Sequence, residues 1–206
     1  MLGPYRVLDL TEGGCMVGGK ILADLGADVI KIEPPGGSKS RNIGPYYKDI
    51  PDPNKSLYWF AYNTNKRSIT LNIEAADGRE LFRRLVKDAD IVMETFPPGY
   101  LGNLDLNYDK LCATKPDIIV ASVTPYGQTG PKAHYQGSEL TAWASGGCLY
   151  VMGDPDRPPV WISFPRPTCT AGPRPLPVQC WPSGTVKSAG KDSRWTCRFS
   201  SASCGA

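Results

Sequence analysis

The sequence predicts an α/β fold built on an open parallel sheet, and three observations lead to this prediction. Short apolar runs, each long enough for one strand, recur through residues 5–127. Stretches with a helical pattern lie between them, and turns rich in glycine and proline follow the apolar runs. This alternation is typical of parallel βαβ units, in which ligand-binding loops lie at the carboxyl ends of the strands.

The predicted elements follow one another in a regular order. Apolar runs predict strands at 5–10, 27–33, 67–73, 90–96 and 117–127. Helical patterns lie at 15–26, 74–89 and 107–115. Gly26 ends the first of these helices, because glycine readily adopts the left-handed conformation that closes a helix. The strand cores are nearly continuous in apolar residues, so we expect helices to cover both faces of the sheet.

Length and composition indicate one sizeable domain followed by a tail. The chain has 206 residues, of which 41% are apolar and 21% charged. We place the domain at 1–164 and define the tail as 165–206, which contains six prolines and six serines but few aliphatic residues. Such a composition predicts an irregular or disordered segment.

The charge distribution argues against nucleic acid as a partner. The tail contains six Lys or Arg and one Asp, a net charge of +5, so the domain carries −2 of the total of +3. The domain therefore lacks the basic surface that binding to phosphate backbones requires.

The sequence also argues against three other classes of protein. No run approaches the roughly 18 apolar residues that span a bilayer, so we expect no membrane partner. The N-terminus lacks a signal-type pattern, which favours a cytoplasmic location. Seven cysteines without CxxC spacing, and a single histidine, predict neither a disulfide framework nor a metal site.

Three loops that follow predicted strands are candidate binding segments, at 34–41, 95–102 and 124–131. Their glycines allow a phosphate to approach the backbone, and Lys39 and Arg41 would supply positive charge. The alternative is that these segments are simple turns, since neither GxGxxG nor a Walker A pattern is present.

Few side chains in the sequence are candidates for catalysis. His134 has no serine or cysteine motif around it and is expected to be an exposed loop residue. Glu139 follows Ser138, which can cap a helix in which a carboxylate is favoured in the first turn. The residues alone thus favour a structural role for Glu139 over a catalytic one.

Six collinear stretches resemble the class III CoA-transferase family, the CaiB/BaiF type, from about residue 2 to 164. They are GPYRVLDLT, LADLGADVIKIEPPGG, NKRSITLNI, ADIVMETFPPGYL, YGQTGP and SELTAWASGG. The resemblance implies a Rossmann-like open α/β domain that is incomplete in this chain. It also implies a homodimer in which two full-length chains interlock.

The resemblance gives Glu139 a chemical role. In this family a carboxylate after the GQTGP loop, usually Asp, is the nucleophile that carries CoA from an acyl-CoA to a carboxylic acid acceptor. CoA is then a substrate, and no separate cofactor is implied. The positions that match the family's CoA-binding residues are Arg41, Leu71, Thr95, Phe96, Gly99 and Gly127. Thr95 stands where the family usually has Asn.

Three functional hypotheses follow. The first is a CoA-transferase that is inactive as this shortened chain. The second is a non-catalytic remnant that still binds CoA. The third is a dinucleotide-binding module, which is disfavoured because the turn TEGGCMVGG lacks the expected glycine spacing.

The tail has a second interpretation, as an out-of-frame translation that arises from a sequencing error or a real frameshift. Read one nucleotide earlier, Trp195 and Thr196 must give aspartate, and permitted codons across 191–200 spell GQPVDVSIQ. This resembles a GEGQxVDVS segment of the family. The nucleotide sequence decides between the two interpretations, because codons that do not yield this motif would exclude the shifted frame.

Overall fold

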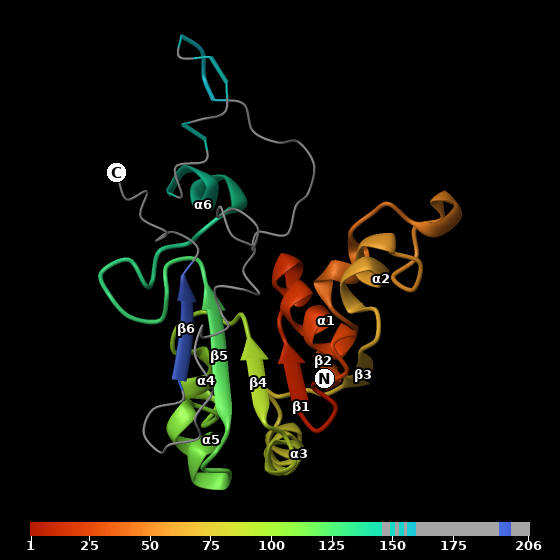
Figure 1. The fold of residues 1–206 in the computed structure, drawn as a ribbon, viewed down its shortest axis with the longest axis vertical. Coiled ribbons are helices and arrows are strands. Elements are labelled where there is room, and N and C mark those ends of the chain that lie inside the picture. Colours follow the sequence, from red (N-terminus) through yellow and green to blue (C-terminus); the bar gives the residue numbers. More distant parts are fainter. Residues whose placement is uncertain (146–148, 151–152, 155, 160–193, 199–206) are drawn as a thin grey trace.

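The computed structural model describes residues 1–145, 149–150, 153–154, 156–159 and 194–198, and these contain one parallel sheet (Figure 1). Its strand order is β3-β2-β1-β4-β5-β6, and every neighbouring pair is parallel. The strands are β1 (Arg6–Leu10), β2 (Asp28–Glu33), β3 (Arg67–Thr70), β4 (Ile91–Glu94), β5 (Ile119–Thr124) and β6 (Arg194–Arg198). This arrangement confirms the predicted open parallel α/β fold.

Helices and short 3-10 turns connect the strands. The helices are α1 (Met16–Asp24), α2 (Leu57–Asn63), α3 (Ala76–Lys87), α4 (Tyr100–Asn103), α5 (Tyr108–Thr114) and α6 (Glu139–Ser145). The 3-10 turns are η1 (Gly13–Cys15), η2 (Lys39–Asn42) and η3 (Tyr47–Asp49). Gly26 follows α1 with a φ of 98°, which confirms its predicted place at the end of that helix.

A cluster of buried apolar residues lies on each face of the sheet. On one face, Phe82 of α3 and Leu111 of α5 pack in the same cluster as Leu8 and Val92 of the central strands. On the other face, the apolar side of α1 packs against Val7 and the residues beside it. Helices on both faces explain why most residues of β1, β2 and β4 are buried.

The strand order reverses between β1 and β4. From β1 the chain passes outward through β2 to β3, and from β4 it passes outward in the other direction to β5. In open α/β sheets, ligands bind outside the carboxyl ends of the strands at such a switch point. The fold therefore directs attention to the loops that follow Leu10 and Glu94.

The predicted irregular tail does not hold for Arg194–Arg198. These residues form β6, which pairs in parallel with β5. The run contains Trp195, Thr196 and Cys197, and aromatic and β-branched residues favour strands. Residues 160–193 and 199–206 lie outside the described residues, and so do the domain boundary at 164 and half of the segment 191–200 on which the out-of-frame interpretation rests.

Among the described residues, no helix has the length and apolar character needed to cross a membrane.

Candidate functional site

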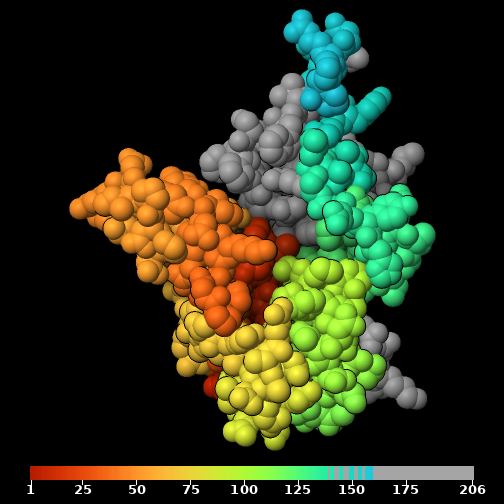
Figure 2. All heavy atoms as spheres, turned by 180° about the vertical axis from the view of Figure 1, so that it is seen from behind, coloured from red at the N-terminus to blue at the C-terminus, as the bar shows by residue number. Residues whose placement is uncertain are grey.

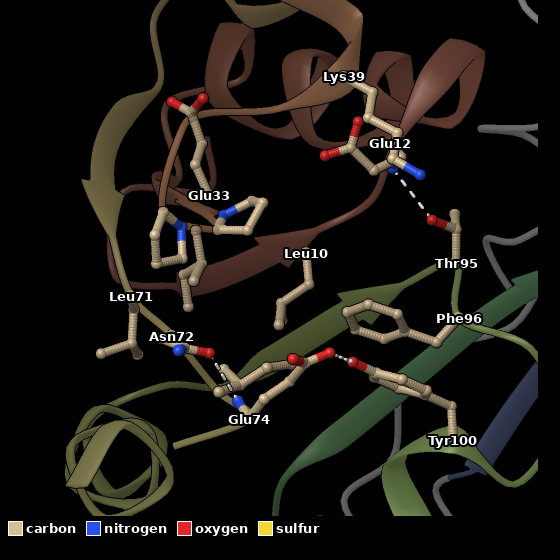
Figure 3. A pocket seen from close by; sticks show the side chains of 14 residues that line it. Leu10, Glu12, Glu33, Lys39, Leu71, Asn72, Glu74, Thr95, Phe96 and Tyr100 are labelled. Atoms are coloured by element: carbon tan, nitrogen blue, oxygen red, sulfur yellow. Dashed lines mark hydrogen bonds between the residues drawn. The ribbon is translucent and has the colours of Figure 1, made fainter.

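A cleft of about 590 Å³ opens at the carboxyl ends of β1, β2, β3 and β4 (Figure 3). Figure 2 shows a hollow on this face, and residues near the N-terminus, in red, form the floor of the hollow. The lining residues are Leu10, Glu12, Ile32, Glu33, Pro34, Pro35, Lys39, Leu71, Asn72, Ile73, Glu74, Thr95, Phe96 and Tyr100. The cleft thus lies at the switch point that the strand order identifies.

The inner surface of the cleft is apolar. Leu10 is the last residue of β1, Ile32 is the second-last residue of β2, and Leu71 directly follows β3. Phe96 and Tyr100 stack with their ring centroids 4.6 Å apart, which makes one wall flat and aromatic. A flat aromatic ligand group would bury apolar area against this surface.

A buried ion pair fixes the wall at the end of β2. Arg41 donates from Nε to Glu33 Oε2 at 2.6 Å and from Nη2 to Glu33 Oε1 at 2.8 Å. Burial opposes ionisation of Glu33, but hydrogen bonds from Arg41, Ser68 and the Ser38 N–H outweigh it and lower the pKa of Glu33 to about 2. The Arg41 guanidinium also lies 4.1 Å from the ring centroid of Trp59. This wall is therefore held rigidly and is close to neutral.

Glu12 and Thr95 connect the two loops at the switch point. The Glu12 N–H donates to Thr95 Oγ1 at 3.0 Å (Figure 3). The Glu12 carboxylate accepts hydrogen bonds from Ser38 Oγ at 2.6 Å and from Ser40 Oγ at 3.2 Å. Because Thr95 Oγ1 accepts the bond from Glu12, its own proton remains to be donated to a ligand in the cleft.

Glu94 is a buried carboxyl beneath the loop that carries Thr95 and Phe96. Its Oε2 accepts the Phe96 N–H at 2.6 Å, and only 3% of the residue is exposed. Burial raises the pKa of Glu94 to about 7, although hydrogen bonds from Ser122 and Phe96 oppose the rise. One short bond from this carboxyl therefore fixes the backbone of a residue that lines the cleft.

The structure brings together some of the sequence-predicted site residues. Leu71, Thr95 and Phe96 line the cleft, and Arg41 holds the Glu33 wall without lining it. Gly99 lies next to the lining residue Tyr100 and has a φ of 85°, a left-handed conformation that glycine adopts without strain.

The remaining two site residues follow β5, and Gly127 is not among the described residues that line this cleft. Gly127 has a φ of 83°, and Glu139 is the first residue of α6. Ser138 Oγ accepts the Thr141 N–H at 3.2 Å, so the predicted helix cap is confirmed. The side chain of Glu139 is outside the described part of the chain. His134 is exposed, as predicted.

Sequence reasoning missed several polar residues of the cleft. Glu12, Glu33 and Glu74 each lie at or just beyond the end of a predicted strand, and that position is the signal that could have identified them. Tyr100 carried no such signal, because its place depends on the turn at Gly99.

Comparisons with known proteins decide the family. The model of the family described as "CoA-transferase family III" matches residues 2–172. The chain belongs to this family. That finding confirms the resemblance drawn from the six sequence stretches.

Curated relatives include CoA-transferases with different named substrates. The chain is 41% identical over 155 residues to succinyl-CoA:(R)-benzylsuccinate CoA-transferase subunit BbsE of Thauera aromatica, covering 75% of this chain and 38% of that protein. It is 43% identical over 165 residues to acetyl-CoA:oxalate CoA-transferase of Acetobacter aceti, covering 78% and 41%. The chain thus spans about two fifths of the length of these relatives.

Solved structures give the same result. A CaiB/BaiF family protein from Brucella suis matches with a TM-score of 0.72 and 38% identity, over 79% of this chain and 43% of that protein. A hypothetical protein from Mycobacterium tuberculosis matches with a TM-score of 0.70 and 34% identity, over 80% and 45%.

Proposed function

We propose that this chain is the CoA-binding part of a CoA-transferase that moves CoA between an acyl-CoA and a carboxylic acid. The observation that carries the proposal is the cleft at the switch point. There Leu71, Thr95 and Phe96, which match the family's CoA-binding positions, lie on one surface although they come from two separate loops. Arg41, a fourth matching residue, holds the adjacent wall.

In this proposal Glu139 is the nucleophile. Its carboxylate attacks the thioester carbonyl of the donor, which forms a mixed anhydride and releases the CoA thiolate. The thiolate attacks the carbonyl carbon of Glu139, which gives an enzyme-bound thioester and frees the donor acid. The acceptor carboxylate repeats the two steps in reverse order, so that a new acyl-CoA leaves and the Glu139 carboxylate is restored. Each step exchanges one activated acyl bond for another.

The proposal requires no separate cofactor, because CoA itself is the substrate. It includes a cytoplasmic location and an interlocked homodimer of the full-length form. Support for a dimer comes from exposed apolar side chains on the segment around α2, which projects from the sheet beside α1 (Figure 1). These side chains are Tyr47, Ile50, Leu57 and Phe60. Apolar residues gathered in this way are typical of protein interfaces.

Mass spectrometry of the purified 206-residue chain tests the proposal. After incubation with a panel of acyl-CoA thioesters, we expect a CoA adduct on the peptide that contains Glu139, because the adduct needs only the first half-reaction, whereas complete transfer to an acceptor is not expected of this shortened chain. Glu139→Gln should abolish the adduct, because the amide is nearly isosteric but cannot act as the carboxylate nucleophile.

Glu80→Gln is the matched control. It makes the same chemical change on the exposed surface of α3, where Glu80 pairs with Arg83 and Arg84, and should leave the adduct unchanged. An adduct that persists in Glu139→Gln would show that a different residue is the nucleophile. CoA binding without any adduct would favour the non-catalytic CoA-binding alternative.

A further inference from the structure

Glu12 is bonded to two other loops of the cleft. Its backbone N–H donates to Thr95 Oγ1 at 3.0 Å, in the loop after β4. Its carboxylate accepts hydrogen bonds from two hydroxyls in the segment after β2, from Ser38 Oγ at 2.6 Å and from Ser40 Oγ at 3.2 Å. Figure 3 shows Glu12, Thr95 and Lys39 at the same end of the cleft. One residue therefore joins the loops that follow β1, β2 and β4.

The two serines give their hydroxyl protons to Glu12. Ser38 is 1% exposed and Ser40 is 2% exposed. The oxygen of Ser38 accepts the Ser40 N–H, and the oxygen of Ser40 accepts the Gly13 N–H, so each hydroxyl proton is donated to Glu12 Oε2. A buried donor that loses its acceptor is costly. Removal of the carboxylate would leave two such donors, and the segment that carries them would have to move.

The residue before Glu12 is anchored, so Glu12 is the fixed side of this contact. The Thr11 N–H donates to Asp9 Oδ1 at 2.9 Å, and the Thr11 carbonyl accepts a hydrogen bond from Lys31 Nζ. On the other side, the turn η2 has only four residues. A helical turn this short is not stable alone, so its position depends on contacts of this kind.

Lys39 lies between the two serines and lines the cleft. Among the described residues that line the cleft it is the single cation, and it is in none of the salt bridges found in the described ranges. CoA carries several negative charges on its phosphates, which a lysine side chain attracts. The backbone of Lys39 is therefore placed by the bonds that its two neighbours make to Glu12.

We propose that Glu12 is a positioning residue for CoA: by holding the hydroxyls of Ser38 and Ser40, its carboxylate places Lys39 in the cleft to pair with a phosphate of CoA. The inference rests on the proposed function, since it assumes that the cleft binds CoA. The negative charge of Glu12 by itself weakens the binding of an anion. A contribution of Glu12 in favour of CoA therefore has to come from its bonds to the serines.

Two substitutions of Glu12 separate these bonds from the charge. Glu12→Gln and Glu12→Ala remove the same charge, but only glutamine keeps a side-chain oxygen that can accept the two hydroxyl protons. Isothermal titration of the 206-residue chain with CoA at low salt gives the Kd and the stoichiometry separately. The Kd of Glu12→Ala should exceed that of Glu12→Gln by about threefold to tenfold, with the same stoichiometry. A purely structural role would instead lower the stoichiometry and leave the Kd of the folded protein unchanged.

Lys39→Met shows whether the effect of Glu12 passes through Lys39. When this cation is absent, the Kd values of Glu12→Gln and Glu12→Ala should agree within about twofold, because the two sites act as one unit. Glu80→Gln and Glu80→Ala are the matched controls. They make the same two changes on the exposed surface of α3, outside the cleft, and should give equal Kd values for CoA.

Ser38→Ala tests the inference from the other side of the contact, including the case in which Glu12→Ala does not fold. It removes one of the two bonds to Glu12 and should raise the Kd for CoA by about twofold to fivefold. Equal Kd values for Glu12→Gln and Glu12→Ala, a difference that persists in Lys39→Met, or an unchanged Kd in Ser38→Ala would overturn the inference and leave the proposed function standing. Failure of the unmodified chain to bind CoA would overturn the proposed function as well.

Discussion

Two buried glutamates, each at the carboxyl end of a strand, have pKa values that are shifted in opposite directions. Glu33 ends β2 and Glu94 ends β4, and each is about 3% exposed. Burial raises the pKa of both, but Arg41 and two serines reverse the effect at Glu33, where the pKa is about 2. Glu94 has only Ser122 and a backbone N–H as partners, and its pKa is about 7. The difference follows from one guanidinium group.

Glu94→Gln should make stability less dependent on pH. The pKa of Glu94 is about 7 in the folded chain against an ordinary value of 4.5, so the folded state binds this proton more tightly than the unfolded state. Its contribution to stability is therefore present at pH 4.5 and is lost as the pH rises through 7. The loss amounts to about 3 kcal/mol at 1.4 kcal/mol per pH unit.

Urea unfolding at pH 5 and at pH 8 measures this effect. Relative to the unmodified chain, Glu94→Gln should gain stability between the two conditions, because its amide can still accept the Phe96 N–H without ionising. Glu80→Gln, on the exposed face of α3, should show no such gain. A pH dependence that survives unchanged in Glu94→Gln would place the titration on another group.

At the level of elements, the sequence predicts the long periodic segments better than the short ones. The five strands and the helices α1, α3 and α5 follow from apolar runs and helical spacing. The helix α2 was missed because it is short and depends on one cap, in which Ser56 Oγ accepts the Trp59 N–H at 3.1 Å. The strand β6 was missed because the composition of the tail outweighed the strand propensity of five residues.

The site was predictable only in part for a related reason. Spacing along the chain shows which residues follow a strand, but it does not give the order of strands in the sheet. Thr95 and Glu12 become neighbours only because β1 lies beside β4. For this reason Thr95 was identified through family resemblance, and Glu12 and Glu74 were not identified at all.

Gly78→Ala should destabilise the protein although alanine favours helices. Gly78 lies in α3, where a Cβ atom would overlap the carbonyl oxygen of Asn72 in the loop that follows β3. The helix would have to move away from this loop, at a cost of about 1–3 kcal/mol. Thermal unfolding should therefore show a lower Tm.

Gly102→Ala is the matched comparison. A Cβ atom on Gly102 in α4 meets nothing within 4 Å, so this change should be neutral or stabilise by about 0.5 kcal/mol. Equal effects of the two substitutions would show that the close approach at Asn72 does not constrain α3.

At the scale of the whole molecule, a buried cluster of charges joins several elements on the face of the sheet that α1 covers. Asp9 of β1 forms ion pairs with Lys66 at 2.7 Å and with Lys31 of β2 at 3.7 Å. Lys66 also donates to the Met16 carbonyl at the start of α1 at 2.7 Å and to Asn63 Oδ1 at the end of α2 at 3.0 Å. Lys31 donates to the carbonyl of Thr11, just before the cleft residue Glu12. One cluster therefore links the sheet, two helices and the loop that leads into the cleft.

The ionisation of this cluster depends on its members being present together. Burial raises the pKa of Asp9, but Lys31, Lys66 and Thr11 outweigh it and the pKa is lowered overall. Burial also lowers the pKa of Lys66, and Asp9 offsets part of that decrease. Both side chains are almost fully enclosed, at 0% exposure for Asp9 and 1% for Lys66. The removal of either charge leaves the other one insufficiently compensated.

Lys66→Met should therefore reduce the free energy of unfolding by about 3 kcal/mol. Methionine fills a similar volume, so the loss reflects the ion pair and the two further hydrogen bonds rather than a cavity. Lys20→Met is the matched control: Lys20 pairs with Asp24 on the surface of α1, where 38% of the Asp24 side chain is exposed, and its replacement should cost less than about 1 kcal/mol. Urea unfolding of the two variants gives both values.

Hydrogen exchange should show the reason for the loss of stability in Lys66→Met. We expect faster exchange at the start of α1 and at the end of α2, because these are the two helix ends that Lys66 binds. A loss below 1 kcal/mol, or faster exchange spread evenly over α3 and α5, would mean that the apolar cores hold the layers together without this cluster.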